Sequence, residues 1–158
     1  MSLLLLNLLL AFAWAALTGS FQPVDLLFGF ALGYLVLWVI TRLGKPTGYF
    51  KRIPLVLGLL GYFLLDLLRA NLRMAGIILS RKMKLRPAVI AVPLILTSEP
   101  AIILFSNLMT LTPGTLSLDI STDRRMLYLH TVYLDDPETF KQELIEGYQR
   151  RLKELFER

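Results

Sequence analysis

The chain has 158 residues, of which 55% are hydrophobic, and its mean hydropathy is +0.59. This composition is too apolar for an ordinary soluble domain of this length and indicates a membrane protein. The absence of cysteine excludes disulfides, thiolate metal sites and thiol catalysis, and the single histidine, His130, excludes a multi-histidine metal site within the chain.

The net charge of +5 is unevenly distributed. Residues 1–86 carry ten Lys/Arg and two acids, a net charge of +8, whereas residues 87–158 carry seven Lys/Arg and ten acids, a net charge of −3. Basic residues beside apolar helices are typical of side chains that flank membrane spans and meet anionic headgroups. The pattern argues against nucleic-acid binding, because the polar half is acidic.

Three apolar segments predict helices at about 3–18, 24–43 and 53–79, which we expect to be transmembrane. The first is at the short limit for a span and is interrupted only by Asn7. The loop before the second helix is so short that these two helices should form an antiparallel hairpin. The alternative, a signal peptide in the first segment, is disfavoured because no basic residue precedes it and a second apolar segment follows at once.

Gly29 and Gly33 form a Gly-x-x-x-Gly pair in the second helix. Such a pair lets another helix approach closely, so both are candidate subunit-interface residues; the alternative is that glycine is simply common in membrane helices. Asp25 lies at the start of the same helix, where a carboxylate favours the N-terminal dipole, and we expect this local role rather than proton transfer.

The third segment begins strongly apolar and ends amphipathic, and Tyr62, Asp66, Arg69 and Arg73 lie along one stripe of it. Charge at membrane depth is costly unless it is paired, reaches the interface or packs against protein. One interpretation is that the stripe marks a helix end at the membrane interface, with its arginines extending to the headgroups. We favour a polar contact with another membrane subunit, with Asp66 and Arg69 paired along the helix, and we predict all four residues to be at that interface.

The basic residues conflict over topology. Three spans would place the connector 42–52, with four basic residues, and the C-terminal half on opposite sides of the membrane. The end of the third helix and the segment after it carry six basic residues, so the positive-inside rule favours a cytoplasmic C-terminal half. If the third segment lay in the interface instead, the side of the N-terminus would change and the C-terminal half would stay in the cytoplasm. We therefore predict a membrane domain at 1–86 and a cytoplasmic domain at 87–158.

Residues 87–158 have the pattern of a small α+β domain of order β-α-β-β-α. The pattern predicts a strand at 88–96, a helix at 101–111, a hairpin of strands at 115–121 and 126–134, and an amphipathic helix that ends at Phe156. Pro93 indicates an edge position or a bulge in the first strand. The predicted fold class is thus an α-helical membrane protein with three transmembrane helices followed by this cytoplasmic domain.

We find no enzyme signature in the sequence. Asp135, Asp136 and Glu138 precede a helix, where acids cap the N-terminus, and His130 has no second histidine to join it. The serines lack a Gly-x-Ser-x-Gly context, and there is no phosphate loop or dinucleotide fingerprint. We expect neither catalysis nor a cofactor or metal site.

Residues 107–121, NLMTLTPGTLSLDIS, are followed by an alternating strand that contains Leu127-Tyr128-Leu129-His130. Together they closely resemble the E subunit of Mrp-type multisubunit Na⁺/H⁺ (monovalent cation/proton) antiporters, and the resemblance extends over nearly the whole chain. It implies an inner cell-membrane complex in which large antiporter-like subunits carry protons and cations. This chain would be a multi-pass, accessory, non-catalytic subunit with a cytoplasmic C-terminal domain, contributing to assembly and stability.

The resemblance implies other membrane subunits of the antiporter, and the lipid bilayer, as partners. Related modules occur in membrane-bound hydrogenase-type respiratory complexes, and a free-standing membrane-anchored binding module is a further alternative. For the motif itself we predict a structural role, a helix stop and a turn, rather than an ion site. The turn residues are Thr110, Thr112, Pro113, Gly114 and Thr115.

Overall fold

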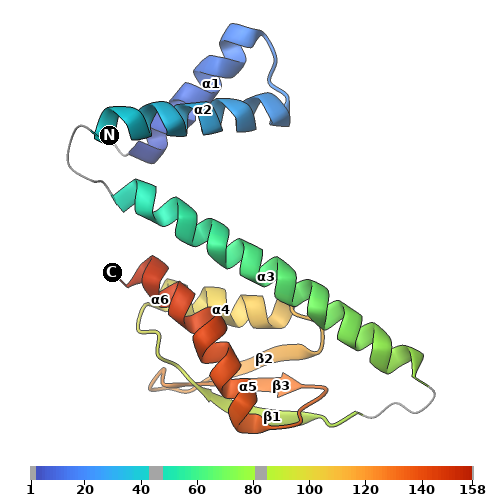
Figure 1. Cartoon of the computed structure of the whole chain (residues 1–158). Coiled ribbons are helices and arrows are strands. Elements are labelled where there is room, and N and C mark those ends of the chain that lie inside the picture. Colours follow the sequence, from blue (N-terminus) through green and yellow to red (C-terminus); the bar gives the residue numbers. More distant parts are fainter. Residues whose placement is uncertain (1–2, 43–47, 81–84, 158) are drawn as a thin grey trace. The chain divides into compact units, whose positions relative to one another are not determined.

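The computed structural model describes residues 3–42, 48–80 and 85–157 (Figure 1). The chain divides into two compact units, Met1–Pro54 and Leu55–Arg158, and the division falls within helix α3 (Gly48–Leu79). The predicted connector 42–52 and the basic segment after α3 lie partly outside the described residues.

The first unit contains a hairpin of two apolar helices, α1 (Leu3–Thr18) and α2 (Pro23–Arg42). Gly29 lies against Trp14 and Ala11, and Gly33 lies against Asn7, so the helices run antiparallel as predicted. The Asn7 side chain is fully buried, and its Nδ2 donates to the Tyr49 hydroxyl at 2.7 Å.

The second unit contains a three-stranded antiparallel sheet with the strand order β1-β3-β2. Its strands are β1 (Ala88–Pro93), β2 (Thr115–Ile120) and β3 (Met126–Thr131). The predicted hairpin of β2 and β3 is confirmed, and its register shifts between Ser117 and Asp119. Strand β1 is an edge strand that ends at Pro93, opposite Met126, which fits a residue without an N–H to donate. The strands end one to three residues earlier than predicted.

Two helical segments pack against the sheet: α4 (Glu99–Leu111) and the C-terminal segment formed by α5 (Pro137–Leu144), η1 (Ile145–Gln149) and α6 (Arg150–Phe156). The core between them consists mainly of buried aliphatic and aromatic side chains. It includes Val92, Phe105, Met109, Leu127, Leu129, Tyr148 and Leu152, and Leu59 of α3. The prediction of one uninterrupted α-helix up to Phe156 was wrong, because a turn of π-helix separates α5 from α6.

By length and composition, two helices are able to cross a membrane among the described residues. They are Pro23–Thr41 within α2 and Arg52–Leu79 within α3. Helix α1 is also apolar, and its 16 residues rise about 24 Å, which is at the short limit for crossing the roughly 30 Å of a hydrocarbon core. Three long apolar helices were expected, and the described residues contain two. Helix α3 also begins five residues earlier than predicted, so Pro54 lies inside it and part of the expected connector is helical.

Candidate functional site

Asp66, in the middle of α3, contacts the C-terminal helical segment of the same chain. The Tyr148 hydroxyl donates to Asp66 Oδ2 at 2.5 Å, and Tyr148 itself is 1% exposed. We predicted Arg69 as the partner of Asp66, whereas the partner in the structure is Tyr148. Burial, and then the hydrogen bond to Asp66, raise the pKa of Tyr148 above its ordinary value, so the tyrosine stays a neutral donor at physiological pH.

Tyr62 lies one helical turn before Asp66 and also packs on the C-terminal helical segment. Its ring makes an edge-to-face contact with the Tyr148 ring, with centroids 4.9 Å apart. The Arg151 guanidinium carbon lies 4.2 Å from the centre of the Tyr62 ring, a cation–π contact. Two rings, one carboxylate and one guanidinium thus form a cluster, which we call the α3–η1 contact: Tyr62, Asp66, Tyr148 and Arg151.

Gly147 and the π-helical turn explain how Tyr62 reaches this position. A side chain at Gly147 would meet the Tyr62 ring, with a Cβ only 2.7 Å from Cζ. The widened turn buries three consecutive residues, Gly147, Tyr148 and Gln149, whereas a regular amphipathic helix would turn one of them to solvent. The Gly147 carbonyl accepts from Arg151 Nη1 at 2.5 Å, so the guanidinium is held over the ring.

Gln149, in the same π-helical turn, contacts the sheet instead of α3. Its Oε1 accepts from the Ile95 amide at 2.8 Å, and its Nε2 donates to the Pro93 carbonyl at 2.9 Å. The side chain is fully buried, so these bonds satisfy backbone groups at the end of edge strand β1. The π-helical turn therefore connects α3 on one side with the sheet on the other.

The Thr-Pro-Gly segment forms the turn between α4 and β2. Thr112 Oγ1 donates to the Leu108 carbonyl at 2.9 Å, and Thr115 Oγ1 donates to the Thr112 carbonyl at 3.0 Å. Gly114 has a φ of +90°, a conformation that residues with a Cβ rarely adopt. Its carbonyl accepts from the Val132 amide at 2.9 Å, which joins the turn to the end of β3. Thr110 Oγ1 donates to the Ser106 carbonyl at 3.1 Å within α4.

The predicted stripe and this turn meet at a cavity of about 90 Å³. Its lining includes Tyr62, Asp66, Arg73, Tyr148 and the 112–115 turn. A volume of this size has room for a few water molecules and is well below the roughly 300–1,000 Å³ of small-molecule sites. Within the described part of the chain there is also no group of three or more His, Asp or Glu side chains able to hold a metal. The geometry thus favours a structural junction.

The other predicted interface residues are the two arginines of α3 and the two glycines of α2; Arg73 also lines the cavity. Arg69 and Arg73 are exposed on α3. Gly29 and Gly33 are buried against α1, so the close helix approach that the pair predicts occurs within this chain.

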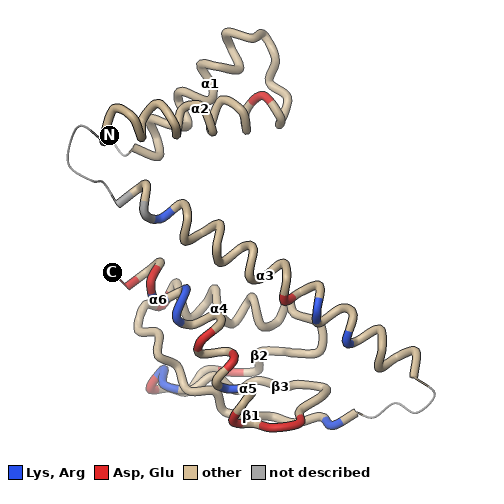
Figure 2. Tube along the Cα trace, viewed as in Figure 1, with Lys and Arg blue, Asp and Glu red and all other residues tan. Residues whose placement is uncertain are grey.

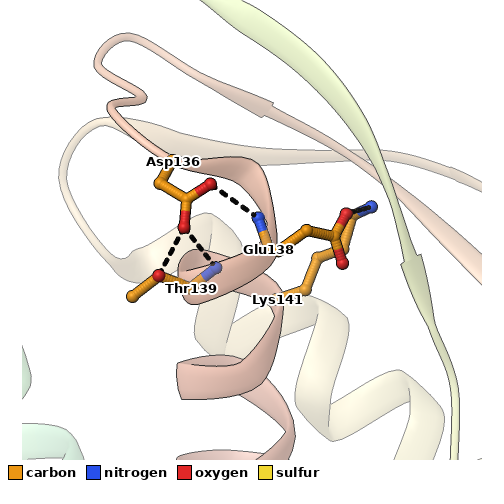
Figure 3. A network of polar contacts seen from close by, with 4 residues as sticks. All are labelled: Asp136, Glu138, Thr139 and Lys141. Atoms are coloured by element: carbon orange, nitrogen blue, oxygen red, sulfur yellow. Dashed lines mark hydrogen bonds and ion pairs between the residues drawn. The ribbon is translucent and has the colours of Figure 1, made fainter.

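The acids after β3 form a cap at the start of α5, as Figure 3 shows. Asp136 accepts from the Thr139 amide at 3.0 Å and from the Thr139 hydroxyl, and Lys141 pairs with Glu138 at 2.8 Å. The bond from the Thr139 hydroxyl is the main cause that lowers the pKa of Asp136. Asp136 thus has the capping role predicted for these acids, whereas Asp135 forms an ion pair with Arg86 at 3.0 Å.

Sequence reasoning missed Gly147, Tyr148 and Arg151 as parts of the contact. The spacing of apolar residues predicts an amphipathic last helix, but it does not show which of its residues contact α3. The available signal was the glycine inside an otherwise strongly helical segment, which is costly unless packing requires it.

Comparisons with known proteins give the same family over both units. The family model described as Na⁺/H⁺ ion antiporter subunit matches residues 7–155. The Na(+)/H(+) antiporter subunit E1 of Staphylococcus haemolyticus is 38% identical over 152 residues, covering 96% of this chain and 93% of that protein.

Two solved structures have a similar fold. A chain of the membrane-bound sulfane sulfur reductase, an archaeal respiratory membrane complex, has a TM-score of 0.61 at 23% identity and covers 99% of this chain and 100% of its own length. A chain of the Mrp complex from Dietzia sp. has a TM-score of 0.50 at 21% identity and covers 63% of this chain and 93% of its own length.

The hairpin and the α+β domain both fall within the matched residues, so the match defines the class of the whole chain, a component of a membrane transport system. The chain belongs to the family of Na⁺/H⁺ ion antiporter subunits. This confirms the resemblance found in the sequence. Membership implies a membrane location and a transporter component rather than an enzyme.

Proposed function

We propose that the chain is an accessory, non-catalytic subunit of a multisubunit Na⁺/H⁺ antiporter that supports assembly and stability of the complex. The observation that carries the proposal is the family match over residues 7–155. Proton transfer across a bilayer needs a relay of ionisable groups. Asp25 and Asp66, the acids of α2 and α3, each accept a hydrogen bond inside the chain, from Ser20 and Tyr148. That chemistry favours a structural role.

The partners of the proposal are other membrane subunits and the lipid bilayer. Residues 1–86 would be associated with the membrane, and the domain 87–158 would face the cytoplasm. The charge pattern supports this orientation, because six of the ten basic residues of the membrane part lie at the end of the third helix and in the segment that leads to the domain. For subunit contacts Arg69 and Arg73 are the best candidates, since Tyr62, Asp66, Gly29 and Gly33 already have contacts within the chain.

A second candidate is a small subunit of a respiratory membrane complex. The similarity of fold to a chain of the sulfane sulfur reductase favours it. Both candidates give the chain an accessory structural role, and they differ in the neighbouring subunits.

Purification of the full chain with a C-terminal tag in mild detergent, followed by mass spectrometry, tests the proposal. Large antiporter-like subunits in stoichiometric yield are the expected result, and respiratory subunits beside them would favour the second candidate. Recovery of the chain alone would contradict both. Arg69→Leu should lower the yield of partners, whereas Arg125→Leu, at an exposed position near the β2–β3 turn, should not.

A further inference from the structure

We infer that α3 does not cross the membrane but lies in its interface, parallel to the bilayer plane, with its leucine face in lipid. The leucine face consists of Leu57, Leu60, Leu64, Leu68 and Leu72. The inference rests on the membrane location proposed above and is independent of the antiporter role.

Helix α3 has two different faces, unlike α1 and α2. The residues of the leucine face follow one another at spacings of three and four, so they lie on one side of the helix, and each is 49–65% exposed. Asn71 is the polar residue among them, and its Nδ2 donates to the Leu67 carbonyl at 2.7 Å. A helix with one apolar and one polar face is typical of segments that lie in the interface, whereas a lipid-exposed span is apolar on all sides.

The opposite face of α3 is occupied by the α+β domain over most of the helix. Leu59 belongs to the domain core, Asp66 bonds to Tyr148, and Met74 and Ile77 line the cavity beside the 112–115 turn. From Leu59 to Ile77 the contact is about 27 Å long, close to the full thickness of a hydrocarbon core. If α3 crossed the bilayer, the turn, the sheet and their charged residues would lie at membrane depth.

Open sheets and turns are not stable in hydrocarbon, because their backbone groups would lack water. The residues of the domain that lie near α3 include Glu143 and Tyr133, which line the same cavity. An α3 in the plane of the membrane avoids this cost, because the domain then lies on the aqueous side and the leucine face enters the boundary of headgroups and acyl chains.

The charge distribution agrees with this orientation and removes the topological conflict in the sequence. All ten Lys/Arg of residues 1–86 follow Thr41, and the α1–α2 loop has none. In Figure 2 the charged residues concentrate in α3 and the domain, whereas α1 and α2 are nearly all uncharged. If the α1–α2 hairpin crosses and α3 does not, every basic residue lies on one side, as the positive-inside rule requires. Three crossings would separate the two basic clusters.

Depth measurements along α3 test the inference. The chain has no cysteine, so single-cysteine variants of the full chain can be labelled with bimane and reconstituted into anionic vesicles that contain nitroxide lipids. Leu57→Cys, Leu64→Cys and Leu72→Cys should give equal depths. In a crossing helix Leu64 would be about 10 Å deeper than the other two positions.

The matched control is a set with identical spacing on α2: Val24→Cys, Ala31→Cys and Val39→Cys, all at exposed positions. There the middle probe should be deepest, by up to about 10 Å. A similar gradient on α3 would overturn the inference. So would an absence of lipid quenching at all three α3 positions, because protein would then cover the leucine face. The measurement needs insertion only, so it is independent of whether antiporter subunits co-purify.

A second test measures from which side of the membrane single cysteines can be labelled. Under the inference Ser2→Cys and Thr122→Cys react with an impermeant maleimide from the same side of the membrane, and Gln22→Cys reacts from the other. Labelling of Ser2 and Thr122 from opposite sides would show three crossings and overturn the inference.

Discussion

At the scale of residues, the second unit depends on a polar contact that is buried between two elements. The Tyr148 hydroxyl donates to Asp66 at 2.5 Å, and Arg151 lies over the Tyr62 ring. A half-buried carboxylate without a donor costs more than the bond itself contributes, so both partners are required together. The contact thus fixes where the C-terminal segment lies along α3.

We expect Tyr148→Phe to destabilise the chain by about 1–3 kcal/mol, because Asp66 loses its donor. Thermal unfolding of the full chain in detergent measures the change, with Tyr128→Phe on the exposed face of β3 as control. Because folding raises the pKa of Tyr148 above its ordinary value of 10.0, the stabilisation should be complete below about pH 10 and decrease at higher pH. Equal melting temperatures for the two variants would contradict the role of this bond.

Gly147→Ala tests the close approach of Tyr62. The new Cβ would lie 2.7 Å from Cζ of the ring, so the ring or the π-helical turn must move, and overpacking of this kind costs about 1–3 kcal/mol. Gly76→Ala, with open space around it in α3, should leave stability unchanged or raise it by up to about 1 kcal/mol. If Gly147→Ala melted no lower than Gly76→Ala, the packing account would be wrong.

At the scale of elements, local patterns predicted the order β-α-β-β-α of the domain, but not the π-helical turn that divides its last helix. Alternating residues predicted the β2–β3 hairpin, and Pro93 predicted the edge position of β1. The π-helical turn could not be predicted, because it depends on Tyr62, which is 85 residues away from Gly147 in the sequence. The Asp66–Tyr148 bond was missed for the same reason, since helical spacing reports neighbours on one helix only.

The turn between α4 and β2 requires a positive φ at Gly114, where the structure has +90°. We expect Gly114→Val to destabilise the domain by roughly 1–3 kcal/mol. Gly114→Asn introduces a side chain of similar size but tolerates positive φ, so it should cost less. Equal losses in thermal unfolding would assign the effect to crowding against Met74 and Val132 rather than to the backbone.

At the scale of the whole molecule, the chain combines an apolar hairpin with a domain that docks on an amphipathic helix. The sequence shows that three crossings would separate the two basic clusters. It does not indicate that α3 lies in the interface, because the length and apolarity of α3 satisfy the criteria for a span. The inferred orientation depends on the length of α3 that the domain covers, which only the folded structure reveals. The same docking engages Asp66, the acid of α3, in a hydrogen bond with Tyr148, which fits a structural subunit.

The most direct measurement for the accessory role is Na⁺/H⁺ antiport per assembled complex in membrane vesicles, with wild-type chain and with Asp66→Leu. The variant removes the acceptor of Tyr148, so we expect less assembled complex. Total antiport should fall in proportion to the amount of complex, with the rate per complex and the KM for Na⁺ unchanged. A normal amount of complex with lost antiport would contradict the account, because Asp66 would then act in transport itself.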